Sequence, residues 1–308
     1  MKSPQRCGPC WPQLLLAILL FQPATKLNGQ AVSAAEQGVN LQTVSVTVTG
    51  HDGGLLADLK AENFRLTRGG KPLAVATAQL NDNPSCIGIL VDKSGSMRPK
   101  VGVAERAIMD FVRASNPGDR FFLVNFNDNP YLDQDFTGDS QRIEDAFQRQ
   151  SPRGGTALYD AIWAAADHLQ ENASCKARLL LVVTDGGDNS SRKSLQQAVD
   201  HLKTLNALSL FITDISDYDP NVHASKRALE MLAESANGEL VYVGLNKMDK
   251  RLQLIAAEIR NRYTLAYTTT NEMANTSGPY EVKVHSDRYK ELVAKVEKTD
   301  STKPDAAK

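Results

Sequence analysis

Four short apolar runs, separated by segments of helical spacing, constrain the fold of this chain more than any other feature. The runs lie at residues 87–91, 121–126, 179–183 and 208–212. Apolar residues with amphipathic helical spacing fill the intervals, at 101–114, 157–170, 195–205, 225–236 and 249–261. Continuously apolar strands that alternate with helices are typical of a parallel sheet covered on both faces. The sequence therefore predicts an α/β domain over residues 85–262.

Strand patterns lie on both sides of this region. In the N-terminal flank, residues 40–82, three valines at positions 44, 46 and 48 alternate with polar residues, as in a half-buried strand. The C-terminal flank, residues 263–298, has similar alternation, and the tail at 299–308 is polar and expected to fray. Each flank alone is small for a stable sheet. We expect the two flanks to pair into one small β-sandwich, with the α/β domain inserted between them.

The first thirty residues have the pattern of a secretory signal peptide. Lys2 and Arg6 precede an apolar run at 14–21, and small or polar residues follow. The run is about half of the ~20 residues that a membrane-spanning helix needs. We therefore expect residues 1–30 to be removed and the mature chain, without a transmembrane segment, to be secreted, periplasmic or part of the cell envelope. A short permanent membrane anchor is the alternative.

The charge balance restricts the partners. The chain has 35 basic and 36 acidic residues, for a formal net charge of −1. Removal of residues 1–30 would take away three basic and no acidic residues, which lowers the net charge to −4. A nearly neutral or mildly acidic protein has no overall field that attracts nucleic acid or an anionic membrane. We expect no nucleic-acid partner.

Oxygen-bearing side chains gather where the predicted core strands end. Asp92, Ser94 and Ser96 follow the first strand, Thr156 lies in a Gly-Gly-Thr loop before a helix, and Asp185 follows the third strand. In open parallel sheets, ligands bind beyond the carboxyl ends of the strands. Five hard oxygen donors at one place fit a small hard cation such as Mg2+. Lys93, between two of these residues, is expected to face solvent because neighbouring loop positions point apart.

The donor set also indicates what such a site does. Two carboxylates and three hydroxyls neutralise a divalent ion incompletely if some contacts run through water, so the ion would attract an external carboxylate. Such a site binds an Asp or Glu side chain of a protein partner and needs no nucleophile or general base. No nucleophile, base and orienting group can be assembled from the motifs of this chain, so we expect no enzyme.

The set Asp92, Ser94, Ser96, Thr156 and Asp185 resembles the metal-ion-dependent adhesion site of von Willebrand factor type A domains. The resemblance covers about residues 85–262. Strands followed by such a domain are also similar to the bacterial type A-related proteins described from acidobacteria. The resemblance implies a Rossmann-like, doubly wound fold, Mg2+ or Mn2+ in the site and protein ligands. It further implies that Ser94 and Ser96 bind the metal directly, and that the other three residues bind it directly or through water.

Two cysteines remain in the mature chain, Cys86 before the first core strand and Cys175 before the strand that leads to Asp185. These strands are neighbours in the doubly wound order, so both cysteines would lie at the end of the sheet opposite the metal. In an oxidising compartment we expect a disulfide between them, with two free thiols as the alternative.

Two functions are therefore open. The first is a secreted, non-enzymatic binding module that captures an acidic side chain of a protein partner through Mg2+ or Mn2+. The alternative is a structural or scaffold component of a cell-envelope assembly whose interactions do not depend on metal.

Overall fold

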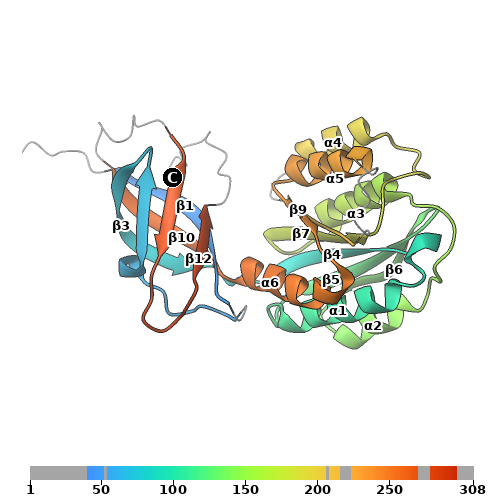
Figure 1. Ribbon diagram of the computed structural model, residues 1–308, viewed down its shortest axis with the longest axis horizontal. Coiled ribbons are helices and arrows are strands. Elements are labelled where there is room, and N and C mark those ends of the chain that lie inside the picture. The colour runs from blue at the N-terminus through green and yellow to red at the C-terminus, as the bar shows by residue number, and fades with distance from the viewer. Residues whose placement is uncertain (1–39, 52–53, 206–207, 216–222, 270–277, 297–308) are drawn as a thin grey trace, which may run out of the picture. The chain divides into compact units, whose positions relative to one another are not determined.

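The computed structural model describes residues 40–51, 54–205, 208–215, 223–269 and 278–296. The predicted signal peptide (1–30) and the predicted polar tail (299–308) lie outside these residues and stay predictions. Two six-stranded sheets make up the described fold, one in the α/β region and one built from the flanks. Figure 1 shows the helices gathered around the first of these sheets.

The α/β sheet has the strand order β6-β5-β4-β7-β8-β9. Its central strand, β4 (Ser85–Asp92), pairs in parallel with β5 (Arg120–Phe126) on one side and β7 (Ala177–Thr184) on the other. The sheet continues in parallel through β8 (Leu208–Asp214) to β9 (Glu239–Tyr242), while β6 (Pro130–Thr137) is antiparallel at the other edge. The chain order reverses at β4, which confirms the doubly wound fold. In sheets of this kind, ligands bind beyond the carboxyl ends of the strands at the reversal point.

Helices cover both faces of this sheet (Figure 1). One face carries α1 (Val101–Ala114), α2 (Ser140–Phe147) and α6 (Met248–Arg260). The other carries α3 (Leu158–Asn172), α4 (Leu195–Thr204) and α5 (His223–Ser235). The predicted helices and apolar strands all form. The sequence patterns did not predict β6, α2 and β9.

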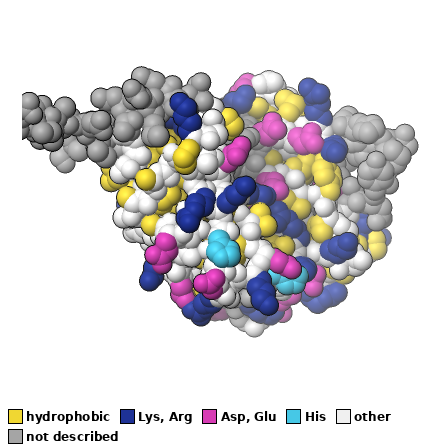
Figure 2. Space-filling model, turned by 60° about the vertical axis from the view of Figure 1, so that its left-hand side comes forward, with side chains coloured by type: hydrophobic (Ala, Val, Ile, Leu, Met, Phe, Trp, Pro, Cys, Tyr) yellow, Lys and Arg dark blue, Asp and Glu magenta, His cyan; other side chains and the backbone are white. Residues whose placement is uncertain are grey.

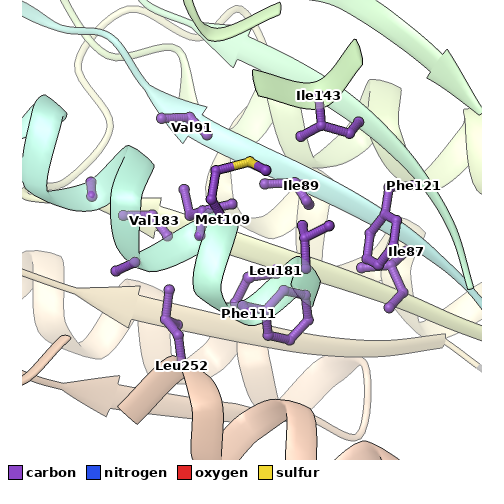
Figure 3. Close-up of a cluster of buried hydrophobic side chains, with 14 of the residues drawn as sticks. Ile87, Ile89, Val91, Met109, Phe111, Phe121, Ile143, Leu181, Val183 and Leu252 are labelled. Carbon is purple, nitrogen blue, oxygen red and sulfur yellow. The ribbon is translucent and has the colours of Figure 1, made fainter. Parts of the chain in front are cut away.

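The core explains why β4 is apolar throughout. All eight of its residues are buried, because helices cover both of its faces. Ile87, Ile89 and Val91 point toward α1 and α6, where Figure 3 shows them among Met109, Phe111 and Leu252. Cys86 and Leu90 point to the opposite face. This packing fixes the end of β4, and with it the position of Asp92.

The two flanks pair with each other, as predicted, and their strands form one six-stranded antiparallel sheet. Its order is β11-β2-β3-β10-β1-β12, so β10 (Arg262–Thr269) of the C-terminal flank lies between β3 (Lys71–Leu80) and β1 (Asn40–Thr49) of the N-terminal flank. The remaining strands are β2 (Phe64–Arg68), β11 (Tyr280–Val284) and β12 (Val293–Val296). The edge strands β11 and β12 also lie against each other, so the sheet folds over one core.

Candidate functional site

Asp92 forms the floor of the candidate site. It is the last residue of β4 and is fully buried. One carboxylate oxygen accepts a hydrogen bond from the Ser94 amide (2.7 Å), and the other accepts one from the Thr184 hydroxyl at the end of β7 (2.7 Å). Burial raises the pKa of Asp92 above its ordinary value, although the hydrogen bonds from Thr184 and Ser94 oppose that shift. Both oxygens are thus fixed by neighbouring strand ends.

A chain of hydroxyl contacts leads from this floor to the second carboxylate. A short 3-10 helix, Gly95–Met97, follows Ser94 and turns the loop so that the Ser94 and Ser96 hydroxyls lie 3.1 Å apart. The Ser96 hydroxyl donates to Asp185 Oδ1 at 2.8 Å. The structure therefore brings together four of the five predicted donors, Asp92, Ser94, Ser96 and Asp185.

Thr156, the fifth predicted donor, lies buried in the adjoining loop. Backbone contacts join this loop to the residues after β4: the Gly95 amide donates to the Gly154 carbonyl (3.1 Å), and the Arg153 amide donates to the Lys93 carbonyl (2.8 Å). The Thr156 amide donates to Asn189 Oδ1 (2.8 Å), which ties the loop to the turn after Asp185. Asn189 was not predicted, and only its place four residues after Asp185 could have indicated it.

Gly154 and Gly155 are needed for this loop to close. Gly154 has φ +69°, a conformation that side chains disfavour, and a Cβ there would lie 2.1 Å from Asp128 Oδ2. The Asp128 carboxylate accepts a hydrogen bond from the Gly155 amide at 2.7 Å. The Gly-Gly pair thus lets the backbone pass close to Asp128, in the loop that carries Thr156 beside the residues after β4.

The expectation that Lys93 faces solvent is wrong. Its side chain is buried, and its ammonium donates to the Glu105 carboxylate of α1 and to the Phe147 carbonyl at the end of α2 (2.9 Å). Alternate loop positions do point apart, but Lys93 points to a side that α1 and α2 cover. The burial is tolerated because a carboxylate and a helix C-terminal carbonyl satisfy the charge.

A second lysine contacts the site directly. Lys100 Nζ lies 2.9 Å from Asp185 Oδ2, and the two side chains are only 15% and 2% exposed. The sequence patterns did not indicate Lys100, which lies eight residues after Asp92 and just before α1. Asp188, three residues after Asp185, accepts hydrogen bonds from the Tyr159 amide in the first turn of α3 (3.1 Å) and from Ser191.

In the part of the chain that the structure describes, no three His, Cys, Asp or Glu side chains gather as a metal cluster. The predicted donor set differs from such a cluster, because it has only two carboxylates and its other three donors are hydroxyls. Among the same residues, no helix has the length and apolarity to span a membrane. Figure 2 shows one face of the molecule, where basic and acidic side chains are interspersed, as expected from the near-neutral net charge.

The predicted disulfide is confirmed. Cys86 at the start of β4 is bonded to Cys175 before β7, with the two Cα atoms 5.5 Å apart. These strands are neighbours in the sheet, as the doubly wound order requires. Because Cys86 is the second residue of β4 and Asp92 is its last, the disulfide lies at the end of β4 away from the candidate site.

Comparisons with known proteins agree with this fold. The family model of the von Willebrand factor type A domain matches residues 87–188, about a third of the chain, and this span contains all five predicted donors. Among solved structures, a von Willebrand factor type A protein from Catenulispora acidiphila is similar, with a TM-score of 0.51 and 12% identity over 83% of this chain and 72% of that one.

A mutant of the PilB minor pilin from Streptococcus sanguinis has a TM-score of 0.50 and 12% identity, over 72% of this chain and 79% of its own. An aerotolerance-related membrane protein from Bacteroides fragilis has a TM-score of 0.46 and 19% identity, over 57% and 98% of the two chains. The sequence matches no curated protein.

The α/β region of this chain therefore has the fold of a von Willebrand factor type A domain. Such domains are typically adhesion or protein-interaction modules and are generally not enzymes.

Proposed function

We propose that the α/β domain captures an acidic side chain of a protein partner through a Mg2+ or Mn2+ ion. The observation that carries this proposal is the chain of contacts from Asp92 through Ser94 and Ser96 to Asp185, at the carboxyl ends of the neighbouring strands β4 and β7. The side-chain oxygen atoms of these residues lie close enough together to bind one cation, and the contacts to that cation would replace the hydrogen bonds between them.

The chemistry of these donors suits a hard divalent ion. Carboxylate and hydroxyl oxygens are ligands that Mg2+ and Mn2+ accept, whereas no cysteine or histidine takes part. The hydroxyls of Ser94, Ser96 and Thr156 would supply neutral contacts, and Asp92 and Asp185 the two negative charges. The bound ion would supply the electrostatic attraction for a carboxylate from outside.

The charge count at the site favours an anionic partner. Two carboxylates at most balance the charge of one divalent ion, and Lys100 beside Asp185 adds a further positive charge. The exposed Arg98 and Arg153 lie on two loops that backbone hydrogen bonds join, one from the Arg153 amide to the Lys93 carbonyl and one from the Gly95 amide to the Gly154 carbonyl. A partner that offers Asp or Glu would gain from all of these charges.

The cellular setting belongs to the same proposal. The pattern of residues 1–30 supports export to the periplasm, the cell envelope or the medium, where a carboxylate-binding module would meet its partners. The more specific likeness to the type A-related proteins described from acidobacteria rests on the strands at 44–80 that precede the domain.

Titration calorimetry with Mg2+ and Mn2+ tests the metal site. We expect the wild-type protein to bind one ion, Ser94→Ala to bind it at least about ten-fold more weakly, and Asp92→Ala to give no metal-dependent heat, since each loses a donor. Ser45→Ala in β1, away from the donors, is the matched control and should bind like wild type. Absence of heat from the wild type, or equal heat from Asp92→Ala, would contradict the proposal.

A further inference from the structure

Both carboxylate oxygens of Asp185 have partners within the chain itself. Its Oδ1 accepts the Ser96 hydroxyl at 2.8 Å, and its Oδ2 contacts the Lys100 ammonium at 2.9 Å. Ser96 in turn contacts Ser94 at 3.1 Å. The donors predicted for a metal ion thus satisfy one another in this arrangement, and the positive charge beside Asp185 comes from a lysine.

The Lys100 contact is anchored, unlike an ordinary surface ion pair. The Lys100 amide donates to the Met97 carbonyl (2.8 Å), and its own carbonyl accepts from the amides of Val103 (3.0 Å) and Ala104 (3.1 Å) in α1. Its side chain is 15% exposed and that of Asp185 is 2% exposed. Little water screens the pair, so the ammonium is an effective local charge at the site.

We propose that Lys100 is an internal cation that competes with the divalent ion for Asp185. The inference rests on the proposed metal site and adds its regulation. In a lysine-closed state, Ser94, Ser96, Asp185 and Lys100 satisfy one another as seen here. In a metal-loaded state, Asp185 serves the ion, and the Lys100 ammonium is free to contact an acidic partner.

Electrostatics makes the two states alternatives. An ammonium and a divalent ion that contact the same carboxylate repel each other at short range, where the interior screens weakly. Lys100 therefore lowers the affinity of the site for metal, and in the metal-free site its charge offsets the repulsion between Asp92 and Asp185. Metal occupancy then responds to the divalent-ion concentration rather than being permanent.

Substitution of Lys100 by methionine tests the competition, because methionine keeps the aliphatic stem and removes the charge. We expect Lys100→Met to bind Mn2+ at least about ten-fold more tightly than wild type in titration calorimetry. Lys100→Arg, which keeps the charge, should bind no more tightly than wild type. Arg113→Met is the matched control, since Arg113 is exposed in the last turn of α1 and pairs with Asp110 (3.3 Å) instead of Asp185; it should bind like wild type.

Thermal unfolding gives a second readout. Without metal, Lys100→Met should melt below wild type, and saturating Mn2+ should raise its Tm by more than it raises the wild-type Tm. Equal or weaker Mn2+ binding by Lys100→Met, with the wild type still binding, would overturn the competition and leave the metal site intact. Absence of Mn2+ binding by wild type and Lys100→Met alike would overturn the metal site and the competition together.

Discussion

Lys93 shows at the scale of one residue how the loop after β4 is held. Its ammonium is buried against Glu105 of α1 and the Phe147 carbonyl of α2, and it lies 6.0 Å from the centre of the Phe147 ring. The neighbouring Asp92 and Ser94 are two of the proposed metal donors. Lys93 therefore connects the geometry of those donors to two helices, α1 and α2, that carry none of the proposed donors.

Loss of the Lys93 charge should be costly. Lys93→Met leaves the mostly buried Glu105 without its partner, and we expect the free energy of unfolding to fall by about 2–3 kcal/mol in urea titrations. Arg113→Met, which removes an exposed ion pair with Asp110, should cost less than about 1 kcal/mol. The interpretation fails if the two variants lose equal stability.

Asp119 is a buried acid outside the candidate site. It accepts hydrogen bonds from the amides of Ser85 (2.7 Å) at the start of β4 and Asn116 (3.1 Å), and it is 2% exposed. Burial raises its pKa from 3.8 to about 6, against the opposing effect of these hydrogen bonds. The folded state therefore holds a proton on Asp119 at pH values where the unfolded chain has released it.

This shift predicts a pH dependence of stability. The stabilising contribution is fully present below the unfolded pKa of 3.8 and is lost as the pH rises through about 6. Relative to Asp119→Asn, the wild type should lose about 2 kcal/mol of unfolding free energy between pH 4 and pH 7, with a chelator present at both values. A difference between the two proteins that does not change with pH would contradict the assigned pKa.

The donors of the candidate site could be predicted from the sequence because each stands in a short motif at the end of an apolar run. The charges around them could not. Lys93 meets Glu105 twelve residues away, and Lys100 meets Asp185 across 85 residues. Such pairs arise only when α1 and α2 are docked on the sheet, and no local pattern encodes that docking.

At the scale of elements, the site depends on one loop that carries Gly154. Gly154→Ala would place a Cβ against the Asp128 carboxylate in a backbone conformation that alanine disfavours. We expect the unfolding free energy to fall by about 1–3 kcal/mol and Mn2+ binding to weaken, because Thr156 shifts with the loop.

Gly186→Ala is the matched control for this loop. Gly186 follows Asp185 directly, yet a Cβ there would have open space around it. Its unfolding curve and Mn2+ affinity should stay close to those of the wild type. Equal effects of the two substitutions would show that strain at Gly154 does not hold the loop.

The elements that the sequence did not predict are those with little apolar surface. Strand β6 is an edge strand with a mixed burial pattern, β9 has only four residues, and α2 has eight residues with three of them buried. The central strands and long helices, by contrast, bury enough side chains to show a clear period. Periodicity therefore identifies the interior of the sheet better than its edges.

At the scale of the whole molecule, the chain crosses between its two sheets twice. Strand β10 pairs with β1 and β3, which precede the α/β domain, so the antiparallel sheet is complete only after the domain has been traversed. The nesting was predictable because both flanks alternate and neither is large enough alone. The strand order was not predictable, since the alternation of apolar and polar residues does not specify which strands pair.

The Cys86–Cys175 bond closes a loop with a sequence separation of 89. The double variant Cys86→Ala/Cys175→Ala should lose about 2–4 kcal/mol of unfolding free energy, since its unfolded state regains the freedom of that loop. Its Mn2+ affinity should match the wild type, because the bond lies at the other end of β4. A loss of metal affinity in the folded double variant would contradict this separation of stability from binding.

The most direct test of the central claim follows solvent-proton relaxation in the Mn2+-loaded protein. Addition of a peptide that carries a Glu side chain should reduce the relaxation enhancement, because the carboxylate replaces water on the ion. The same peptide with Gln should have no effect, and Ser94→Ala should bind too little Mn2+ to respond. Equal responses to the Glu and Gln peptides, or none to either while Mn2+ stays bound, would contradict capture of an acidic partner through the metal.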